Sequence, residues 1–103
     1  MKRGEVRWYK FKHPDKKRLV VILTRNSILD YLGEVTIAPI TSTIRDISSE
    51  VLLSRRDGMH NDCAVNYDHI QTVSKSNVGS MIASLSREKL SKVRDAVNFA
   101  LNL

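Results

Sequence analysis

A continuous apolar run near the start of the chain reads Leu19-Val20-Val21-Ile22-Leu23. Three of its five residues are β-branched, which favours a strand, and no polar residue interrupts the run. A strand of this kind is covered on both faces and lies in the interior of a sheet. We therefore expect residues 19–23 to form a central strand around which the rest of the chain is arranged.

Shorter strand-like segments lie on both sides of this run. They cover residues 4–11, 35–40, 50–53, 64–66 and 69–73, the last two being either one bent strand or two short ones. Pro39 cannot donate a ladder hydrogen bond, so we expect an edge or a bulge there. Residues 26–32 predict about two helical turns, with Asn26 as a cap and an end at Gly33. Asp57-Gly58 predicts a turn.

The C-terminal residues change from strand periodicity to helix periodicity. One apolar stripe recurs at helical spacing and consists of Leu90, Val93, Val97, Ala100 and Leu101. Ser86 is a suitable N-cap, and Leu85 can pack against Leu90 across it. Five or six short strands and one terminal helix predict the α+β class, with a small, twisted, barrel-like sheet packed by that helix.

The chain is short and basic. Its 103 residues, 42% of them hydrophobic, fit one domain over residues 1–103, with no repeat or linker. Because a domain of this size buries only about two thirds of the surface of its unfolded chain, burial of more surface in a homodimer is plausible. Seventeen Lys and Arg against eleven Asp and Glu give a net charge of +6, which favours nucleic acid or an acidic protein as partner. The alternative is a protein that is simply basic.

No segment is typical of membrane insertion or secretion. No apolar run approaches the roughly 18 residues that span a bilayer, and the basic start is not followed by an apolar stretch. Cys63 is the only cysteine, so no intramolecular disulfide can form, and we expect a reducing, cytoplasmic location. We expect Cys63 itself to be a half-buried strand residue.

Several classes of enzyme lack their motifs in this chain. There is no Cys/His zinc spacing, Walker loop, glycine-rich dinucleotide fingerprint or nucleophile elbow, and the carboxylates form no obvious metal cluster. An enzyme of this composition would work with Arg, His, Thr, Ser and a lone carboxylate, and without a cofactor. Those groups suit cleavage of RNA by its own 2′-hydroxyl, which needs a base, a cation for the phosphorane and a proton for the leaving oxygen.

Five segments occur in a characteristic order over nearly the whole chain. They are residues 3–8 (RGEVRW), 18–23 (RLVVIL), 35–42 (VTIAPITS), 64–75 (AVNYDHIQTVSK) and the C-terminal helix. Each is weak alone, but in this order they resemble the MazF/PemK toxins of bacterial type II toxin–antitoxin pairs. The resemblance implies an SH3-like barrel of mostly antiparallel strands with a C-terminal helix.

The resemblance also implies an activity and partners. It implies a sequence-selective, metal-independent endoribonuclease that cuts single-stranded RNA through attack of the 2′-hydroxyl. The products would be a 2′,3′-cyclic phosphate and a 5′-hydroxyl, and the consequence would be inhibited translation and growth. A homodimer and a cognate acidic antitoxin that covers the RNA site are implied as well.

The family's two main catalytic residues match Arg18 and Thr41. A guanidinium fork binds a phosphate or phosphorane through two hydrogen bonds, and a hydroxyl adds a short third one. The acidic position of the later motif matches Asp68, and the neighbouring His69 could act as a base or an acid near pH 7. The candidates for RNA contact are Ser42, His13, Lys16, Lys17, Arg55 and Arg56.

Each of these assignments has a purely structural alternative. Arg18 could be a solvated loop residue and Thr41 the capped end of a strand. Asp68 could be a turn carboxylate bonded to backbone N–H groups, and His69 could point outward from a strand.

Departures from the family pattern keep two other functions open. Leu19 stands where proline is usual, His69 and Gln71 replace glutamine and arginine, and the loop over residues 12–17 is short. These departures allow an inactive RNA-binding module of the same fold. A gyrase poison of the CcdB type is the other alternative, but the C-terminus lacks the Trp-Gly-Ile-like end that such proteins use.

Overall fold

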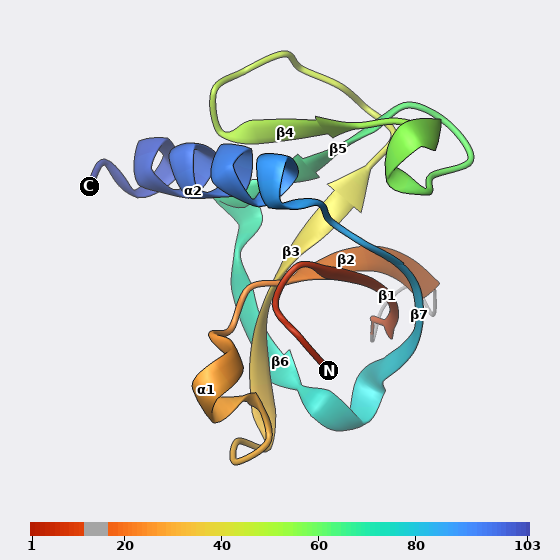
Figure 1. The fold of residues 1–103 in the computed structure, drawn as a ribbon, viewed down its shortest axis with the longest axis vertical. Coiled ribbons are helices and arrows are strands. Elements are labelled where there is room, and N and C mark those ends of the chain that lie inside the picture. Colours follow the sequence, from red (N-terminus) through yellow and green to blue (C-terminus); the bar gives the residue numbers. More distant parts are fainter. Residues whose placement is uncertain (12–16) are drawn as a thin grey trace.

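Seven antiparallel strands and two α-helices make up the computed structural model, which describes residues 1–11 and 17–103 (Figure 1). In chain order the elements are β1 (Glu5–Lys10), β2 (Lys17–Ile22), α1 (Asn26–Leu29), β3 (Glu34–Thr41), β4 (Glu50–Leu53), β5 (Cys63–Asn66), β6 (Gln71–Ser74), β7 (Val78–Ser84) and α2 (Arg87–Leu101). Short 3-10 turns lie at Arg55–Asp57, Tyr67–His69 and Lys75–Asn77. The expected α+β class is confirmed.

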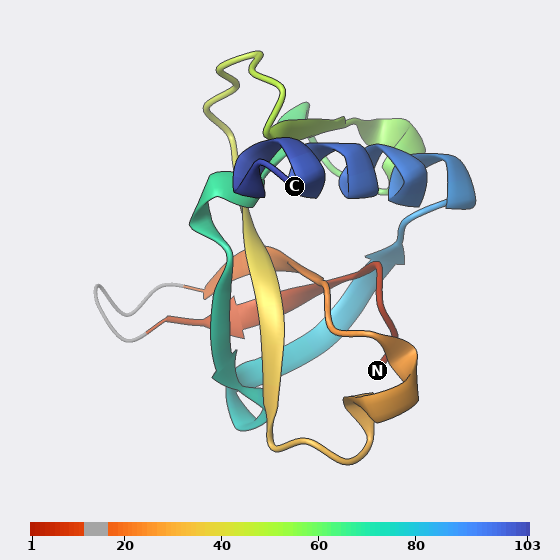
Figure 2. The same ribbon diagram turned by 90° about the vertical axis from the view of Figure 1, so that its left-hand side faces the viewer.

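The sheet is curled but not closed. The strand order is β4-β5-β3-β2-β1-β7, and β6 pairs with β3 beside this path. Among the described strands no ladder joins β7 back to β4 or β6, so the expected barrel is an open one. Figure 2 shows β4, β5 and α2 as one layer above the other strands, with β3 crossing between the two parts.

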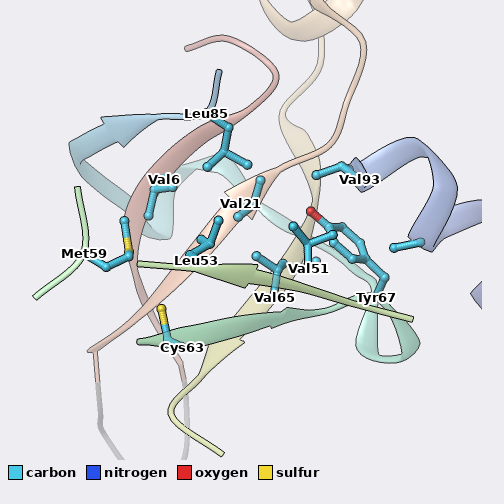
Figure 3. Close-up of a cluster of buried hydrophobic side chains, with 12 residues drawn as sticks. Val6, Val21, Val51, Leu53, Met59, Cys63, Val65, Tyr67, Leu85 and Val93 are labelled. Atoms are coloured by element: carbon cyan, nitrogen blue, oxygen red, sulfur yellow. The ribbon is translucent and has the colours of Figure 1, made fainter. Parts of the chain in front are cut away.

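The run at residues 19–23 forms the central strand that its composition predicts. β2 pairs with β1 on one side and β3 on the other. Val20, Val21 and Ile22 have no exposed surface. Because successive strand residues point to opposite faces, Val21 packs into one core and its two neighbours into another. The first of these cores lies between the sheet and α2 (Figure 3).

Pro39 is neither at a sheet edge nor in a bulge, so that prediction is wrong. β3 is an interior strand, and Pro39 pairs in register with Val20 of β2. The backbone N–H and C=O of Thr36 point toward the β2 side of the strand. Because the backbone groups of successive strand residues point to alternate sides, the nitrogen of Pro39, three residues later, points away from β2. On that side β6 pairs only as far as Ile37, and β5 begins to pair at Ile40. The missing N–H therefore falls in the gap between two partner strands.

Helix α1 is shorter than its sequence predicts. It ends at Leu29, and the side chain of Asn26 accepts a hydrogen bond from the Arg3 N–H at 2.7 Å instead of capping the helix. Tyr31 and Leu32, which would extend the helix, are 85% and 43% exposed. A second turn would bury little apolar surface, and short helices depend on such burial.

Strand β7 is absent from the sequence-based prediction. Its apolar residues do not alternate with polar ones, because Met81 and Ile82 are adjacent and both are exposed. Its pairing with β1 is interrupted by register shifts on either side of Arg7. A strand without regular alternation is recognised only by its partner.

Helix α2 begins as predicted. The Ser86 side chain accepts a hydrogen bond from the Lys89 N–H at 3.1 Å. Val93 and Ala96 are its buried residues, whereas Leu101, expected in the apolar stripe, is 55% exposed. In the described part of the chain no helix is long and apolar enough to cross a membrane.

Candidate active site

A groove of about 820 Å³ opens between the ends of three strands and the loop that joins β4 to β5. Strands β1, β2 and β3 supply one wall, and residues 58–63 supply the other. The lining residues are Trp8, Arg18, Leu19, Ile40, Thr41, Ser42, Thr43, Gly58, Met59, His60, Asn61, Asp62, Cys63 and Ile82. The described lining of the groove therefore combines apolar side chains with the Arg18 guanidinium, several hydroxyls and a polar loop.

Arg18 and Thr41 both line this groove, because the pairing of β2 with β3 brings the ends of the two strands together. The register joins Val20 to Pro39, and two further residues along each strand bring Arg18 opposite Thr41. The Arg18 side chain is exposed, and it has no hydrogen bond or ion pair within the described residues. The Thr41 hydroxyl accepts a hydrogen bond from the Thr43 N–H at 3.1 Å, and Ser42 lines the same groove.

The opposite wall is carried by a tightly capped turn. The Ser54 N–H donates to the Asp57 carboxylate at 2.9 Å, and the Arg56 N–H donates to the Ser54 hydroxyl at 3.3 Å. Gly58 follows with a φ of +95°, a conformation that suits glycine, and a Cβ there would lie 2.9 Å from the Cβ of Ala83. The predicted turn at Asp57-Gly58 is thus confirmed.

Three polar residues of this loop, His60, Asn61 and Asp62, line the groove. Their side chains are exposed and have no hydrogen bond or ion pair within residues 1–11 and 17–103. Sequence reasoning missed them, although a polar run after the Asp57-Gly58 turn was visible as a signal. What it could not show is that this loop faces Arg18.

Trp8 lies where the groove meets a smaller hollow of about 100 Å³. Its side chain is 38% exposed. Lys17, expected to contact RNA, lines the hollow together with Lys10. Trp8 thus belongs to the lining of both the groove and the hollow that holds the two lysines.

Cys63 is buried at the beginning of β5, with 8% of its surface exposed, so it is more buried than expected. Burial raises the pKa of its thiol, and the nearby carboxylates of Asp57 and Asp62 raise it further. The thiol therefore stays protonated near neutral pH, which does not suit a nucleophile.

Asp68 and His69 lie outside the groove, in the turn after β5. Cys63 lines the groove at one end of this strand, and Asn66 ends it roughly 10 Å away, at about 3.3 Å per residue. Asp68 accepts a hydrogen bond from the Ser49 hydroxyl at 2.5 Å, and its N–H donates to the Asn66 side chain at 2.9 Å. His69 belongs to this turn and not to the strand expected over residues 69–73.

Two of the other predicted RNA contacts, Arg55 and Arg56, lie on the turn before the loop and do not line the groove. Arg55 lies behind the loop, where its Nε donates to the His60 carbonyl at 3.3 Å, and Arg56 is exposed on the same turn. His13 and Lys16 lie outside the described residues. Residues 1–11 and 17–103 contain no group of three His, Cys, Asp or Glu side chains that could hold a metal.

An exposed guanidinium, a set of hydroxyls and an aromatic face in one groove suit a polyanion that also carries flat rings. Together with the net charge of +6, these features suit a groove that binds nucleic acid.

Comparisons with known proteins place the chain in a family of toxins. Residues 2–101 match the family model of the "PemK-like, MazF-like toxin of type II toxin-antitoxin system". The chain is 34% identical over 89 residues to Endoribonuclease MazF3 of Mycobacterium tuberculosis, which covers 86% of each protein. The solved structure of the Mycobacterium tuberculosis toxin MazF-mt6 is 30% identical and has a TM-score of 0.89, over 96% of this chain and 97% of that one.

A second solved structure, an endoribonuclease in complex with its cognate antitoxin from Mycobacterial species, has a TM-score of 0.88. It is 23% identical and covers 100% of this chain and 96% of that one, which supports the fold alone.

The chain belongs to the PemK-like, MazF-like toxin family. The resemblance seen in the sequence is confirmed, and with it the expected class of enzyme, since the curated relatives are named endoribonucleases.

Proposed function

We propose that this protein is the toxin of a type II toxin–antitoxin pair and a sequence-selective, metal-independent endoribonuclease acting on single-stranded RNA. The observation that carries the proposal is the meeting of Arg18 and Thr41 in one groove. A guanidinium and a hydroxyl in one groove suit the two non-bridging oxygens of a phosphodiester.

The chemistry follows from this placement. The 2′-hydroxyl attacks the phosphorus and loses its proton to water in the open groove, the O2′–P bond forms and the P–O5′ bond breaks. Arg18 and Thr41 stabilise the charge that gathers on the phosphorane oxygens. The leaving 5′-oxygen takes a proton from His60, a residue that lines the groove. The products are a 2′,3′-cyclic phosphate and a 5′-hydroxyl.

The remaining predicted residues contribute at other places in this proposal. Ser42 adds a donor beside Thr41, and Lys17 holds a phosphate in the hollow next to Trp8. Asp68 and His69 do not line the groove, so we assign them no role in the bond cleavage itself.

The net charge and the exposed apolar side chains support two protein partners, an antitoxin and a second copy of this chain. The net charge of +6 suits an acidic antitoxin, and an endoribonuclease solved in complex with its cognate antitoxin has the same fold. Exposed apolar side chains, among them Tyr31 and Leu32, support a homodimer in which they are covered. We place such a pair in the cytoplasm.

The proposal is tested with purified protein and a long single-stranded RNA in excess EDTA, followed by mapping of the cut ends. We expect discrete cuts that carry 5′-hydroxyl and 2′,3′-cyclic phosphate ends. Intact RNA after incubation with folded protein would contradict the endoribonuclease assignment for that substrate. In that case a gyrase cleavage assay distinguishes a gyrase poison from an inactive RNA-binding module.

Replacing Trp8 by alanine should weaken RNA binding about tenfold. A base stacked on an aromatic ring contributes about 1–3 kcal/mol, and the partly exposed indole lies where the groove and the lysine hollow meet. Affinity is measured with a fluorescent, 2′-deoxy analogue of the substrate that cannot be cleaved. Trp8→Phe keeps an aromatic face and should retain most of the affinity. Equal affinities for the alanine variant and the wild type would argue against stacking.

A further inference from the structure

We infer that Asp62 and Asn61 read the nucleobase next to the cleaved bond and select a base whose exocyclic amino group lies beside a ring-nitrogen acceptor. Cytosine and adenine have this edge, and uracil does not. The inference rests on the proposed function and adds the chemical origin of its sequence selectivity.

The first observation is unused hydrogen-bonding capacity. At the far end of β5 the polar side chains are bonded to one another, as in the pair of Ser49 and Asp68. By contrast, Asn61 and Asp62 line the groove with no partner in the described part of the chain. A polar group that loses water on binding must find a partner in the ligand, and this requirement discriminates between ligands.

The second observation is that the backbone of the loop is held on both sides of these residues. The Met59 N–H donates to the Ser54 carbonyl at 3.2 Å, and the Met59 side chain is 5% exposed. On the other side, Cys63 pairs with Leu53 of β4. A backbone held on both sides limits how far the loop can shift to suit a base of the wrong pattern, which favours selectivity.

Helix α2 adds a third restraint. The Lys89 ammonium donates to the Leu52 carbonyl at 2.7 Å and lies 3.7 Å from the Asp57 carboxylate. The turn that carries the loop is therefore tied both to β4 and to the helix that packs over it.

The chemistry of the two side chains sets the preferred base. An ionised Asp62 only accepts hydrogen bonds, and Asn61 can donate through its amide. Together they complement an amino donor beside a ring acceptor. Uracil presents a carbonyl oxygen and an N–H in the reverse order, so the carboxylate would face another acceptor. Trp8, on which a base can stack, lines the same groove as these two side chains.

The test uses RNA oligonucleotides that differ only at the positions flanking the cut, with A, C, G or U at each. Single-turnover rates are measured for the wild type, for Asp62→Asn and for Asp30→Asn, an exposed carboxylate beside α1 and outside the groove. At one flanking position we expect the wild type to prefer A or C over U by about tenfold or more. Comparison of the rates for the four bases at that position shows whether adenine or cytosine is preferred.

In Asp62→Asn this preference should fall below about threefold. The main reason is that the new amide can donate to uracil, so the RNA that carries uracil is cleaved faster. The Asp30→Asn variant should keep the wild-type preference. Asn61→Ala is a second variant that should weaken the same preference. Circular dichroism shows whether Asp62→Asn folds. If it does not fold, Asn61→Ala alone tests whether this loop selects the base.

The outcomes separate the inference from the proposed function. No cleavage by the wild type would overturn the proposed function itself. Cleavage by the wild type with an unchanged base preference in the folded variants would overturn only the inference. Loss of all cleavage in a folded Asp62→Asn variant would also overturn it, because the carboxylate would then serve the reaction and not the choice of base.

Discussion

Arg18→Ala is expected to lower the rate of RNA cleavage about 100- to 1,000-fold with no loss of folding. Removal of one preorganised donor to a charged transition state has an effect of this size. Arg18 is the cation of the groove wall formed by β2 and β3. Its side chain is exposed and has no hydrogen bond or ion pair within the described residues. Its removal should therefore change the free energy of unfolding little. The measurement is the single-turnover rate on a defined oligonucleotide, with unfolding followed in parallel.

Two further variants make this result specific. Arg18→Lys keeps the charge but loses the planar fork that binds two phosphate oxygens, so we expect an intermediate rate. Arg25→Ala removes an exposed arginine outside the groove and should cut at the wild-type rate. If Arg18→Ala were as active as Arg25→Ala, the phosphate would have to bind elsewhere and the proposed site would be wrong.

Leu53→Ala is expected to destabilise the protein by about 2–5 kcal/mol, the range for truncating a buried leucine. Leu53 is 1% exposed and belongs to the core shown in Figure 3, between β4 and the strands beneath it. Domains of this size are stabilised by only about 5–15 kcal/mol in total, so the change is a large share. The free energy of unfolding is obtained from urea denaturation followed by circular dichroism.

The neighbouring residue supplies the matched control. Leu52 is 46% exposed because adjacent strand residues point to opposite faces. Leu52→Ala removes the same atoms and should cost less than about 1 kcal/mol at the same protein concentration. Similar losses for both variants would mean that β4 does not bury the face that the structure assigns to the core.

Elements with a strong local pattern were predictable from the sequence. β2 was recognised by its unbroken β-branched run and α2 by its cap and helical spacing, because burial imposes these periods directly on the residues. The expected family and the pairing of Arg18 with Thr41 in one site rested on the order of weak motifs, and the structure places both residues in one groove.

The tertiary structure alone decided what lies opposite that pair. Pairing between distant segments brings the loop with Asn61 and Asp62 to the groove and leaves Asp68 at the other end of β5. The same long-range pairing created β7 and gave Pro39 its place inside the sheet. Local sequence encodes which residues are buried, but the strand order determines which loops face each other, and no local pattern records that order.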